Sequence, residues 1–235
     1  MRKGRFNARM AGQGDMDAVL ALRAQQFRGG CEDADAFDTS CLHGLVEDAD
    51  TQQVVSSFRA LPLASGADIA QSHAAGVYDL SGLSEFGQPM LEIGRICVAP
   101  GANHPDILRL TWALLARVTD RFDAALLFGC ASFAGTDPRK YSHVFAYLKA
   151  HHRAPSKWAP RQRAAHIFAL DGVHPGKKAD LALCPALLRM YVTMGGWVSD
   201  HGVVDHDLGT LHVFTALEVA KILPSRRASL RAESG

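Results

Sequence analysis

An apolar run near the middle of the chain limits the fold more than any other segment. The residues AALLFGCAS (124–132) contain no charged side chain, and a short apolar run of this kind is typical of a strand buried on both faces of a sheet. The preceding segment predicts a long helix that begins at Pro105, because apolar residues follow that proline at helical spacing. Together they indicate a central sheet covered by helices.

The N-terminal part alternates between strand and helix patterns. Four segments have the composition and length of strands: 6–10, 43–47, 52–61 and 90–98. A helix is predicted over 15–27, with Asp15 as its N-cap, and a broken helix over 67–86. The resulting order, β-α-β-β-α-β-α-β, predicts a mixed α/β fold around one central sheet.

The length of 235 residues suits a single domain, 1–235, with one core. We expect the core over about 5–135, a C-terminal elaboration over about 136–222 and a frayed tail over 223–235. Three further elements are predicted in the elaboration: helices near 140–149 and 185–194, and a strand near 211–215.

Composition restricts where the protein works. The five cysteines are widely spaced and include no C-x-x-C pair, which predicts reduced thiols in a cytoplasmic protein. The N-terminus is basic but no apolar segment follows it, so a secretory signal is not expected. No apolar run approaches the roughly 20 residues of a membrane-spanning helix, and any membrane contact is therefore expected to be peripheral.

A histidine-rich segment near the C-terminus raises the question of a metal site. Its candidate ligands are His201, Asp205, His206, Asp207 and His212. Their irregular spacing matches no zinc motif, and we expect no metal. For Cys130 we expect a buried thiol rather than a nucleophile, because the sequence places no histidine beside it.

The net charge of +1 conceals two oppositely charged segments. Residues 29–58 contain seven acidic and no basic residues, whereas 138–170 contain seven basic and no acidic residues. The basic block consists of Arg139, Lys140, Lys149, Arg153, Lys157, Arg161 and Arg163. Such a block is typical of a surface that meets an anionic partner, or of a solvated face. It contains no nucleic-acid-binding motif, so we expect no nucleic acid.

Five motifs follow one another along the chain: LRAQQF (22–27), DAFD (35–38), HGLVED (43–48), SFRALPL (57–63) and LEIGRICV (91–98). This series resembles the acyl-homoserine lactone synthases and, more closely, the bacterial ornithine N-acyltransferases, both of the wider N-acetyltransferase-like superfamily. Three later segments are similar to downstream segments of the ornithine-lipid enzymes: LFGCASFAGTDP (127–138), CPALLRMYVTMGGWVSD (184–200) and GVVDHDLGTLHVF (202–214). The resemblance therefore extends from about Leu22 to Phe214.

The resemblance implies a mixed central sheet of the N-acetyltransferase-like (GNAT) type, splayed at the strand 90–98. It implies transfer of a 3-hydroxyacyl group from acyl carrier protein to the α-amine of ornithine, which yields a lyso-ornithine lipid. No cofactor is expected, because the acyl-phosphopantetheine thioester on acyl carrier protein is the donor substrate.

The expected partners are acyl carrier protein, ornithine or a similar amino acid, and, at the membrane surface, anionic lipids of the inner membrane. Acyl carrier proteins are acidic, and five residues of the basic block are the candidate docking residues: Arg139, Lys140, Arg153, Lys157 and Arg161.

Glu92, in the motif EIGR, matches the family's glutamate and is the candidate general base. A base is needed because an amino acid arrives as an ammonium, which cannot attack a thioester before it loses a proton. Arg95 completes the motif as the second candidate catalytic residue. Without the resemblance, a simple ion pair between Glu92 and Arg95 is the favoured interpretation.

Six residues match the family's substrate-binding positions: Arg23, Phe27, Asp35, Asp38, Arg59 and Arg95. Guanidinium groups suit the acceptor's carboxylate, because they bind it through two parallel hydrogen bonds. Asp35 and Asp38 would bind a side-chain ammonium or hold the arginines in place. The alternatives are a solvated helix residue for Arg23 and an ordinary acidic loop for the aspartates.

On the donor side, backbone N–H groups of Cys97 and Val98 are the candidates for an oxyanion hole. The next loop, APGANHPDILRL (99–110), lacks the R/Q-x-x-G-x-G/A pattern with which coenzyme A-dependent relatives hold a diphosphate. This favours acyl carrier protein as donor, with Asn103 and His104 at the phosphate. Tyr141 is a candidate acid for the leaving thiolate, although a core tyrosine is the preferred interpretation.

Three alternatives stay open. The first is an acyl-homoserine lactone synthase, but the segment FRGGCEDAD (27–35) lacks the tryptophan-rich loop of those enzymes. The second is an N-acyltransferase for another amino acid, such as glutamine. The third is a non-catalytic protein that binds acyl carrier protein or a membrane surface, which a Glu92 far from any cavity would favour.

Overall fold

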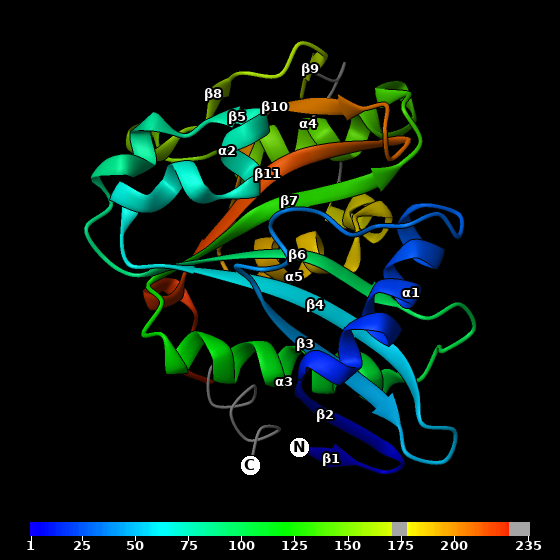
Figure 1. The fold of residues 1–235 in the computed structure, drawn as a ribbon. Helices are drawn as coiled ribbons and strands as arrows, with labels where there is room; N and C mark the ends of the chain where they lie inside the picture. The colour runs from blue at the N-terminus through cyan, green and yellow to red at the C-terminus, as the bar shows by residue number, and fades with distance from the viewer. Residues whose placement is uncertain (171–177, 226–235) are drawn as a thin grey trace. The chain divides into compact units, whose positions relative to one another are not determined.

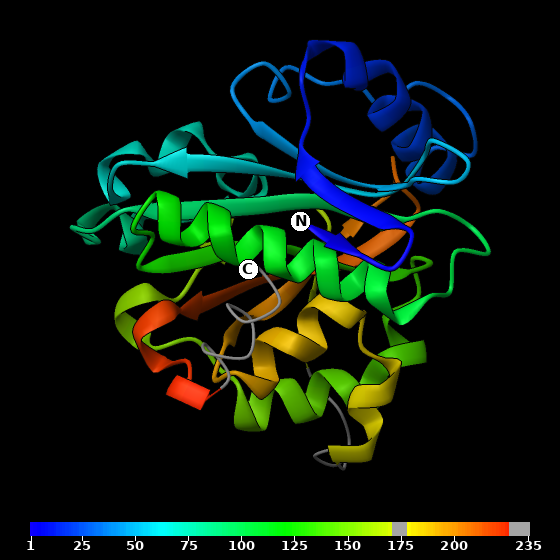
Figure 2. The ribbon, with the colours of Figure 1, turned by 90° about the horizontal axis from the view of Figure 1, so that it is seen from below.

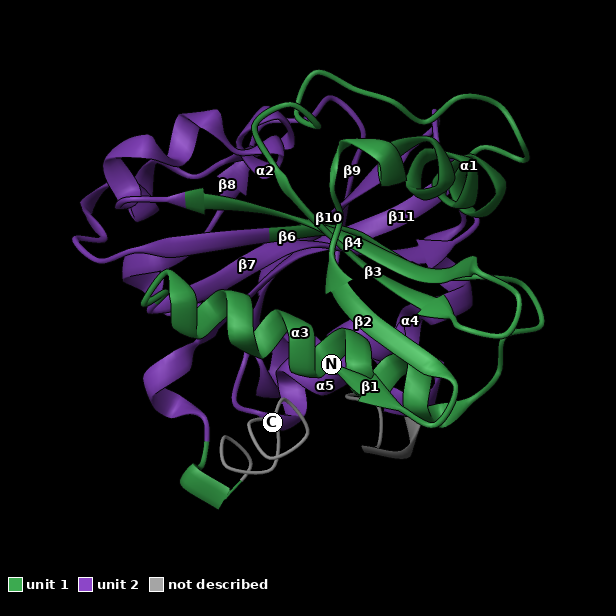
Figure 3. Ribbon diagram, turned by 60° about the horizontal axis from the view of Figure 1, so that its bottom comes forward, with its two compact units in different colours: residues 1–62, 93–124, 223–235 green, residues 63–92, 125–222 purple. Residues whose placement is uncertain are grey.

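The computed structural model describes residues 1–170 and 178–225. They fall into two compact units (Figure 3): unit 1 comprises 1–62, 93–124 and 223–225, and unit 2 comprises the other described residues. Segments of the two units alternate along the chain. The predicted arrangement has a single boundary, near residue 135, between a core and a C-terminal elaboration, and this arrangement stays a prediction. The predicted tail lies, from residue 226 on, outside the described residues.

Unit 1 is built on the antiparallel strands β1 (Arg2–Lys3), β2 (Phe6–Met10), β3 (Leu42–Asp48) and β4 (Gln53–Leu63), each paired with the next (Figure 1). The later residues of β6 (Met90–Val98) adjoin β4, and Ala99 N just beyond them donates to Val55 O (2.8 Å). Helices α1 (Met16–Phe27) and α3 (Pro105–Arg121) lie on opposite faces of these strands (Figure 2).

Helix α3 packs its apolar face on β2 and β3. Leu110 and Leu114, one helical turn apart, are both buried there. The Phe58 ring fills the space that a Cβ on Gly44 would need, and Leu114 touches the same point. Only glycine therefore allows β3 to approach this part of the core.

In unit 2, β7 (Leu126–Ala134) pairs in parallel with the first residues of β6, from Met90↔Leu126 to Glu92↔Phe128. On its other side it pairs antiparallel with β11 (Thr210–Glu218), which is followed in the sheet by β10 (Trp197–Asp205) and β9 (Ile167–Ala169). A second, two-stranded sheet joins β5 (Tyr78–Asp79) to β8 (Arg161–Gln162). Leu126 and Phe128 are fully buried, as the apolar run predicts.

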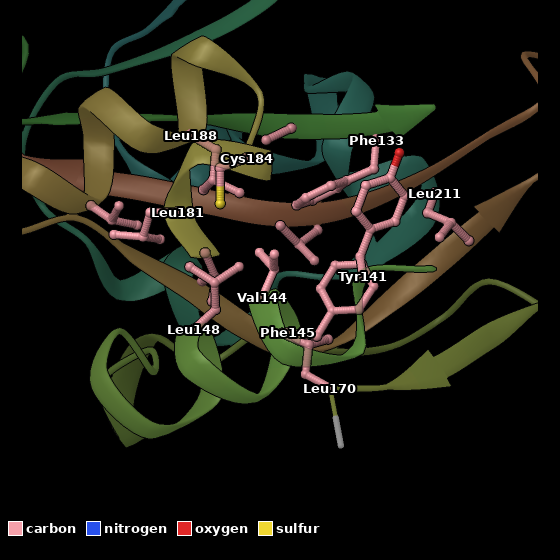
Figure 4. Close-up of a cluster of buried hydrophobic side chains, with 14 residues drawn as sticks. Phe133, Tyr141, Val144, Phe145, Leu148, Leu170, Leu181, Cys184, Leu188 and Leu211 are labelled. Carbon is pink, nitrogen blue, oxygen red and sulfur yellow. The ribbon is translucent and has the colours of Figure 1, made fainter. Parts of the chain in front are cut away.

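One face of the sheet in unit 2 is covered by α4 (Ser142–His151) and α5 (Ala186–Thr193). Between them and the strands lies a cluster of apolar side chains that includes Phe133, Phe145 and Leu188 (Figure 4). Tyr141 belongs to this cluster, and its hydroxyl donates to Ala134 O (3.0 Å). Tyr141 thus has the environment of a core tyrosine.

Helix α2 (His73–Val77) is the remaining α-helix of the described residues. Short 3₁₀ turns complete the structure: η1 (Gln13–Asp15), η2 (Gly66–Gln71), η3 (Ser81–Glu85), η4 (Pro138–Tyr141), η5 (Ser156–Trp158), η6 (Lys178–Leu183) and η7 (Val219–Lys221).

The predicted order of elements is confirmed, with local corrections, and the short strands β1, β5, β8 and β9 were not predicted. The broken helix over 67–86 is mostly 3₁₀ turns, and only its middle is the α-helix α2. The strand β10 was not predicted, because three polar residues interrupt its apolar pattern. Asp15 precedes α1 but makes no side-chain cap on it, since its carboxylate binds the guanidinium of Arg9 (2.6 and 2.8 Å) and Gly12 N.

Within residues 1–170 and 178–225, no helix combines the length and apolar composition needed to cross a bilayer.

The histidine-rich segment is the β10–β11 hairpin of unit 2. His201 and His212 are buried there against the ring of Tyr78, and His206 lies in the turn between the strands. In the described part of the chain, no three His, Cys, Asp or Glu side chains gather as a metal site requires. Burial lowers the pKa of His212 to about 4, because the imidazole contacts apolar groups and a tyrosine hydroxyl rather than water.

We predict that this histidine makes folding sensitive to acid. Between about pH 6.5 and about pH 4 the unfolded chain binds a proton at His212 that the folded chain does not, so the free energy of unfolding falls as the pH falls. The full effect is about 3 kcal/mol. Urea unfolding gives the free energy of unfolding of the parent and of His212→Asn at about pH 7.5 and about pH 5. The contribution of His212 is the difference between the losses of unfolding free energy that the two proteins show on acidification. Equal pH dependences would contradict the prediction.

Candidate active site

Seven charged residues form one ion-pair network in unit 1. They come from α1 and the loop after it, from β4 and from β6: Arg23, Arg28, Asp33, Asp35, Asp38, Arg59 and Arg95. The network joins four guanidinium groups to three carboxylates. Five of the residues predicted from the motifs are thus brought together.

Arg23 is the most enclosed member of the network and is 1% exposed. Its Nε donates to Asp33 Oδ2 (2.8 Å), its Nη2 to Asp33 O (2.6 Å) and its Nη1 to Asp38 Oδ1 (2.6 Å). These donors are therefore used to fix the acidic loop on α1. A solvated Arg23, the alternative interpretation, is wrong, and whether Arg23 ever contacts a substrate stays a prediction.

Arg59 and Arg95 reach the same loop from two strands. Arg59 Nη1 donates to Asp35 Oδ1 (2.6 Å) and Asp38 Oδ1 (2.9 Å). Arg95 Nε donates to Asp33 Oδ2 (2.9 Å), and its Nη2 lies 3.6 Å from Asp35 Oδ2. The side chain of Arg95 is 12% exposed against 5% for Arg59, so Arg95 is the more accessible of the two.

Aromatic rings cover the two guanidinium groups. The ring centre of Phe27, the last residue of α1, lies 5.4 Å from the guanidinium carbon of Arg95. The ring centre of Phe37 lies 5.5 Å from the guanidinium carbon of Arg59. A ring face attracts a cation and also keeps water from it. Phe27 thus lies beside the site and contacts Arg95. Its contact with a substrate stays a prediction.

Asp33 and Asp38 are held in their ionised form. Burial alone would raise the pKa of Asp38, but hydrogen bonds from Arg23, from Asp35 N and from Arg59 outweigh it and lower that pKa to about 2. The pKa of Asp33 is lowered in the same way, with burial opposing its bonds to Arg23 and Arg95. These two carboxylates therefore stay charged at neutral pH.

Arg95 has a left-handed backbone conformation, with φ of +51°. For a residue with a Cβ this conformation is strained, and it persists only where the surroundings hold it. Its two aspartate partners and the Phe27 ring provide that hold. The strain marks this point of β6 as a candidate functional position.

Glu92 precedes Arg95 on β6 by three residues and belongs to unit 2. The residue is 7% exposed, and each carboxylate oxygen accepts a hydrogen bond from a backbone N–H in the first turn of α2: Oε2 from His73 (2.8 Å) and Oε1 from Ala74 (2.7 Å). The two bonds fix the direction of the carboxylate. Glu92 thus binds α2 and Arg95 binds Asp33, and the simple ion pair between Glu92 and Arg95 stays an alternative interpretation.

The candidate donor-side residues lie in unit 1. Cys97 is buried, with Sγ 3.3 Å from Ser57 Oγ, and burial raises the pKa of its thiol, so the thiol stays neutral. Val98 ends β6. Asn103 N donates to Gly101 O (2.9 Å), and His104 caps α3, with Nδ1 accepting from Asp106 N (3.3 Å). Contacts of these residues with a donor stay predictions.

The basic block lies in unit 2, and some of its cations have partners. Arg139 binds Asp137 (2.8 Å), Arg153 lies 3.7 Å from Asp200, and Lys140 lies over the Tyr141 ring. Lys157 Nζ lies 4.4 Å from the centre of the Trp158 ring, and Arg161 is exposed in β8. The block therefore combines cations with an aromatic ring, and its role in docking stays a prediction.

Two features of the site were not predicted. Asp33, whose side chain is fully buried, contacts three arginines, yet nothing in CEDADAFD distinguishes it from its acidic neighbours. The carboxylate of Glu92 is held by the backbone N–H groups of His73 and Ala74. Because these are backbone groups, no residue type in the sequence indicates the contact.

The chain is similar to proteins of known class. Residues 18–113 match the family model described as acetyltransferase (GNAT) domain. An L-ornithine N(α)-acyltransferase of Rhodobacter capsulatus is 30% identical over 83% of this chain and 78% of its own, and one of Brucella abortus is 30% identical over 81% and 71%.

Among solved structures, a GNAT-like decarboxylase, GphF, in complex with isobutyryl-CoA has a TM-score of 0.51 and 17% identity, over 90% of this chain and 98% of its own. This similarity concerns the fold alone. With the match to the acetyltransferase domain, it confirms the predicted fold of the GNAT type.

We predict that Asp33→Asn destabilises the protein by about 3 to 5 kcal/mol, because it removes one of the two carboxylates that offset the burial of Arg23, and the same carboxylate also binds Arg95. The matched control is Glu32→Gln, which removes the same charge from the exposed neighbouring position. Urea unfolding curves of both variants measure the difference. Similar unfolding free energies for the two would contradict a central role of Asp33.

Proposed function

Since this chain belongs to the L-ornithine N(α)-acyltransferase family, we propose that it transfers a 3-hydroxyacyl group from acyl carrier protein to the α-amine of ornithine, which yields a lyso-ornithine lipid. It is an acyltransferase with an amino-acid acceptor. The observation that carries the finer proposal is the buried carboxylate of Glu92, with both oxygens fixed by backbone N–H groups.

In this proposal Glu92 takes one proton from the ammonium of ornithine, directly or through one water. The free amine then attacks the thioester carbon, and a tetrahedral oxyanion forms. Its collapse breaks the C–S bond, and the second proton of the nitrogen goes to the leaving thiolate. The products are the amide and the free thiol, and Glu92 releases its proton to solvent.

The guanidinium groups that the ion-pair network gathers support a role in binding the acceptor's carboxylate. Arg95 is the better candidate for this contact, because the donors of Arg23 are spent on Asp33 and Asp38. The carboxylate of Asp35, 27% exposed, is the candidate for the side-chain ammonium of ornithine. A panel of amino acids, incubated with 3-hydroxyacyl carrier protein and analysed by mass spectrometry, tests this choice of acceptor.

The start of α3 supports acyl carrier protein as donor. The side chain of His104 already caps this helix, and the carboxylate of Asp106 in the first turn binds Lys3 and Arg109. A coenzyme A diphosphate would meet a carboxylate here, whereas the single phosphodiester of phosphopantetheine carries less charge. The thioester is then the donor substrate, and the proposal needs no further cofactor.

The basic block is the proposed docking face for the acidic carrier protein, and its charge supports this choice. The product is a lipid and has to enter a bilayer, so contact of the same block with anionic headgroups is an additional proposal.

We predict that Glu92→Gln lowers kcat by at least about a hundredfold at neutral pH, as expected for the loss of a general base. Raising the pH should restore part of the activity, because more of the acceptor amine is then already neutral. Steady-state kinetics over pH measure both effects, with circular dichroism as the control for folding. Full activity of the variant would remove Glu92 from this role.

We predict that Lys157→Glu with Arg161→Glu raises the KM for acyl carrier protein by about tenfold at low ionic strength and flattens its salt dependence. The KM for ornithine should stay unchanged. The control is Arg117→Glu with Arg121→Glu on α3, which makes the same charge change at exposed positions of unit 1. Equal carrier-protein kinetics in both double variants would place docking elsewhere.

A further inference from the structure

The position of the Glu92 carboxylate depends on α2, because the two N–H groups that it accepts belong to His73 and Ala74. Helix α2 has only five residues. A helix this short is not stable by itself, since its nucleation cost is not recovered in one turn. Other contacts must therefore keep the two N–H groups in place.

The N-terminal end of α2 is held by Ser72. Its hydroxyl accepts a hydrogen bond from Ala75 N (3.2 Å) and donates one to Ile69 O (2.7 Å). The side chain thus caps α2 and at the same time ties it to the end of η2. Ser72 is 2% exposed, so water cannot replace either bond.

The C-terminal end of α2 is held by Tyr78, the next residue in the chain. Its hydroxyl donates to His212 O (3.0 Å) and lies 3.2 Å from His212 Nδ1. Tyr78 is completely buried. Within unit 2, α2 contacts β7 and lies beside the strands of the sheet (Figure 1). The helix is therefore fastened at both ends, by one hydroxyl at each.

We propose that Ser72 is a positioning residue for the acyl transfer: through the first turn of α2 it fixes the N–H groups of His73 and Ala74, and through them the carboxylate of Glu92. The proposal rests on the proposed function, because it assumes that Glu92 is the base. Tyr78 supports the same helix from its other end. Ser72 itself does not touch the substrate.

Ser72→Ala is expected to lower kcat by about tenfold and to leave the KM for ornithine within about twofold. The reason is that a base displaced by a fraction of an ångström transfers the proton more slowly, while the groups that bind the acceptor stay in place. Raising the pH from about 7 to about 9 should reduce the loss, because the neutral amine no longer needs the base. A purely structural defect would not respond to pH in this way.

The matched control is Ser65→Ala. Ser65 caps η2 in the same segment, through a bond from Ala67 N (3.2 Å), but has no contact with the turn that holds Glu92. Ser72→Thr retains the hydroxyl and should restore most of the activity. If Ser72→Ala does not fold, Tyr78→Phe tests the other end of α2 and should lower kcat with the same pH response. Variants at both ends that match Ser65→Ala would overturn the proposal.

A double-mutant cycle separates this inference from the proposed function. If Ser72 acts through Glu92, adding Ser72→Ala to Glu92→Gln should cause no further loss of kcat. A loss that multiplies with that of Glu92→Gln would overturn the inference, since Ser72 would then act elsewhere. An active Glu92→Gln would instead refute the role of Glu92 itself. An inactive Glu92→Gln with a normal Ser72→Ala would refute only the positioning role.

Discussion

The burial of the Arg23 guanidinium is the constraint on which unit 1 depends. An ion removed from water is tolerated only where partners of opposite charge and suitable geometry surround it. Asp33 and Asp38 supply that geometry, and because each is shared with an arginine of β4 or β6, the loop, the helix and both strands are fixed together. The strained conformation of Arg95 is one result of this closure.

The two candidate groups of β6 are held by different means. Arg95 is positioned by side chains, through ion pairs that require particular residues at several distant points of the chain. Glu92 is positioned by the backbone, through the turn that Ser72 closes. An electrostatic network sets the direction of the Arg95 guanidinium, and a hydrogen-bonded turn sets the direction of the Glu92 carboxylate. Each can therefore be altered with little effect on the other.

The sequence predicts the elements whose pattern is strong. The apolar run that became β7 and the amphipathic face of α3 needed no further information, and the family motifs marked Arg23, Arg59 and Arg95 together. Strand β10 was not predicted, because the polar residues Ser199, Asp200 and His201 interrupt its apolar pattern. In the structure these residues make hydrogen bonds with one another. Asp33 could not be separated from its acidic neighbours, because burial in an ion-pair network is a tertiary property.

The backbone hold on Glu92 has a consequence for how this protein can change over evolutionary time. Every amino acid except proline offers the same N–H, so the side chain at position 73 can change without removing its hydrogen bond to the carboxylate, whereas the completely buried Ala74 leaves room only for a small side chain. A lineage is therefore free to vary position 73, while the backbone hydrogen bonds to Glu92 are inherited intact. Proline alone would be purged there, and that exclusion would be the trace of this contact in an alignment of descendants.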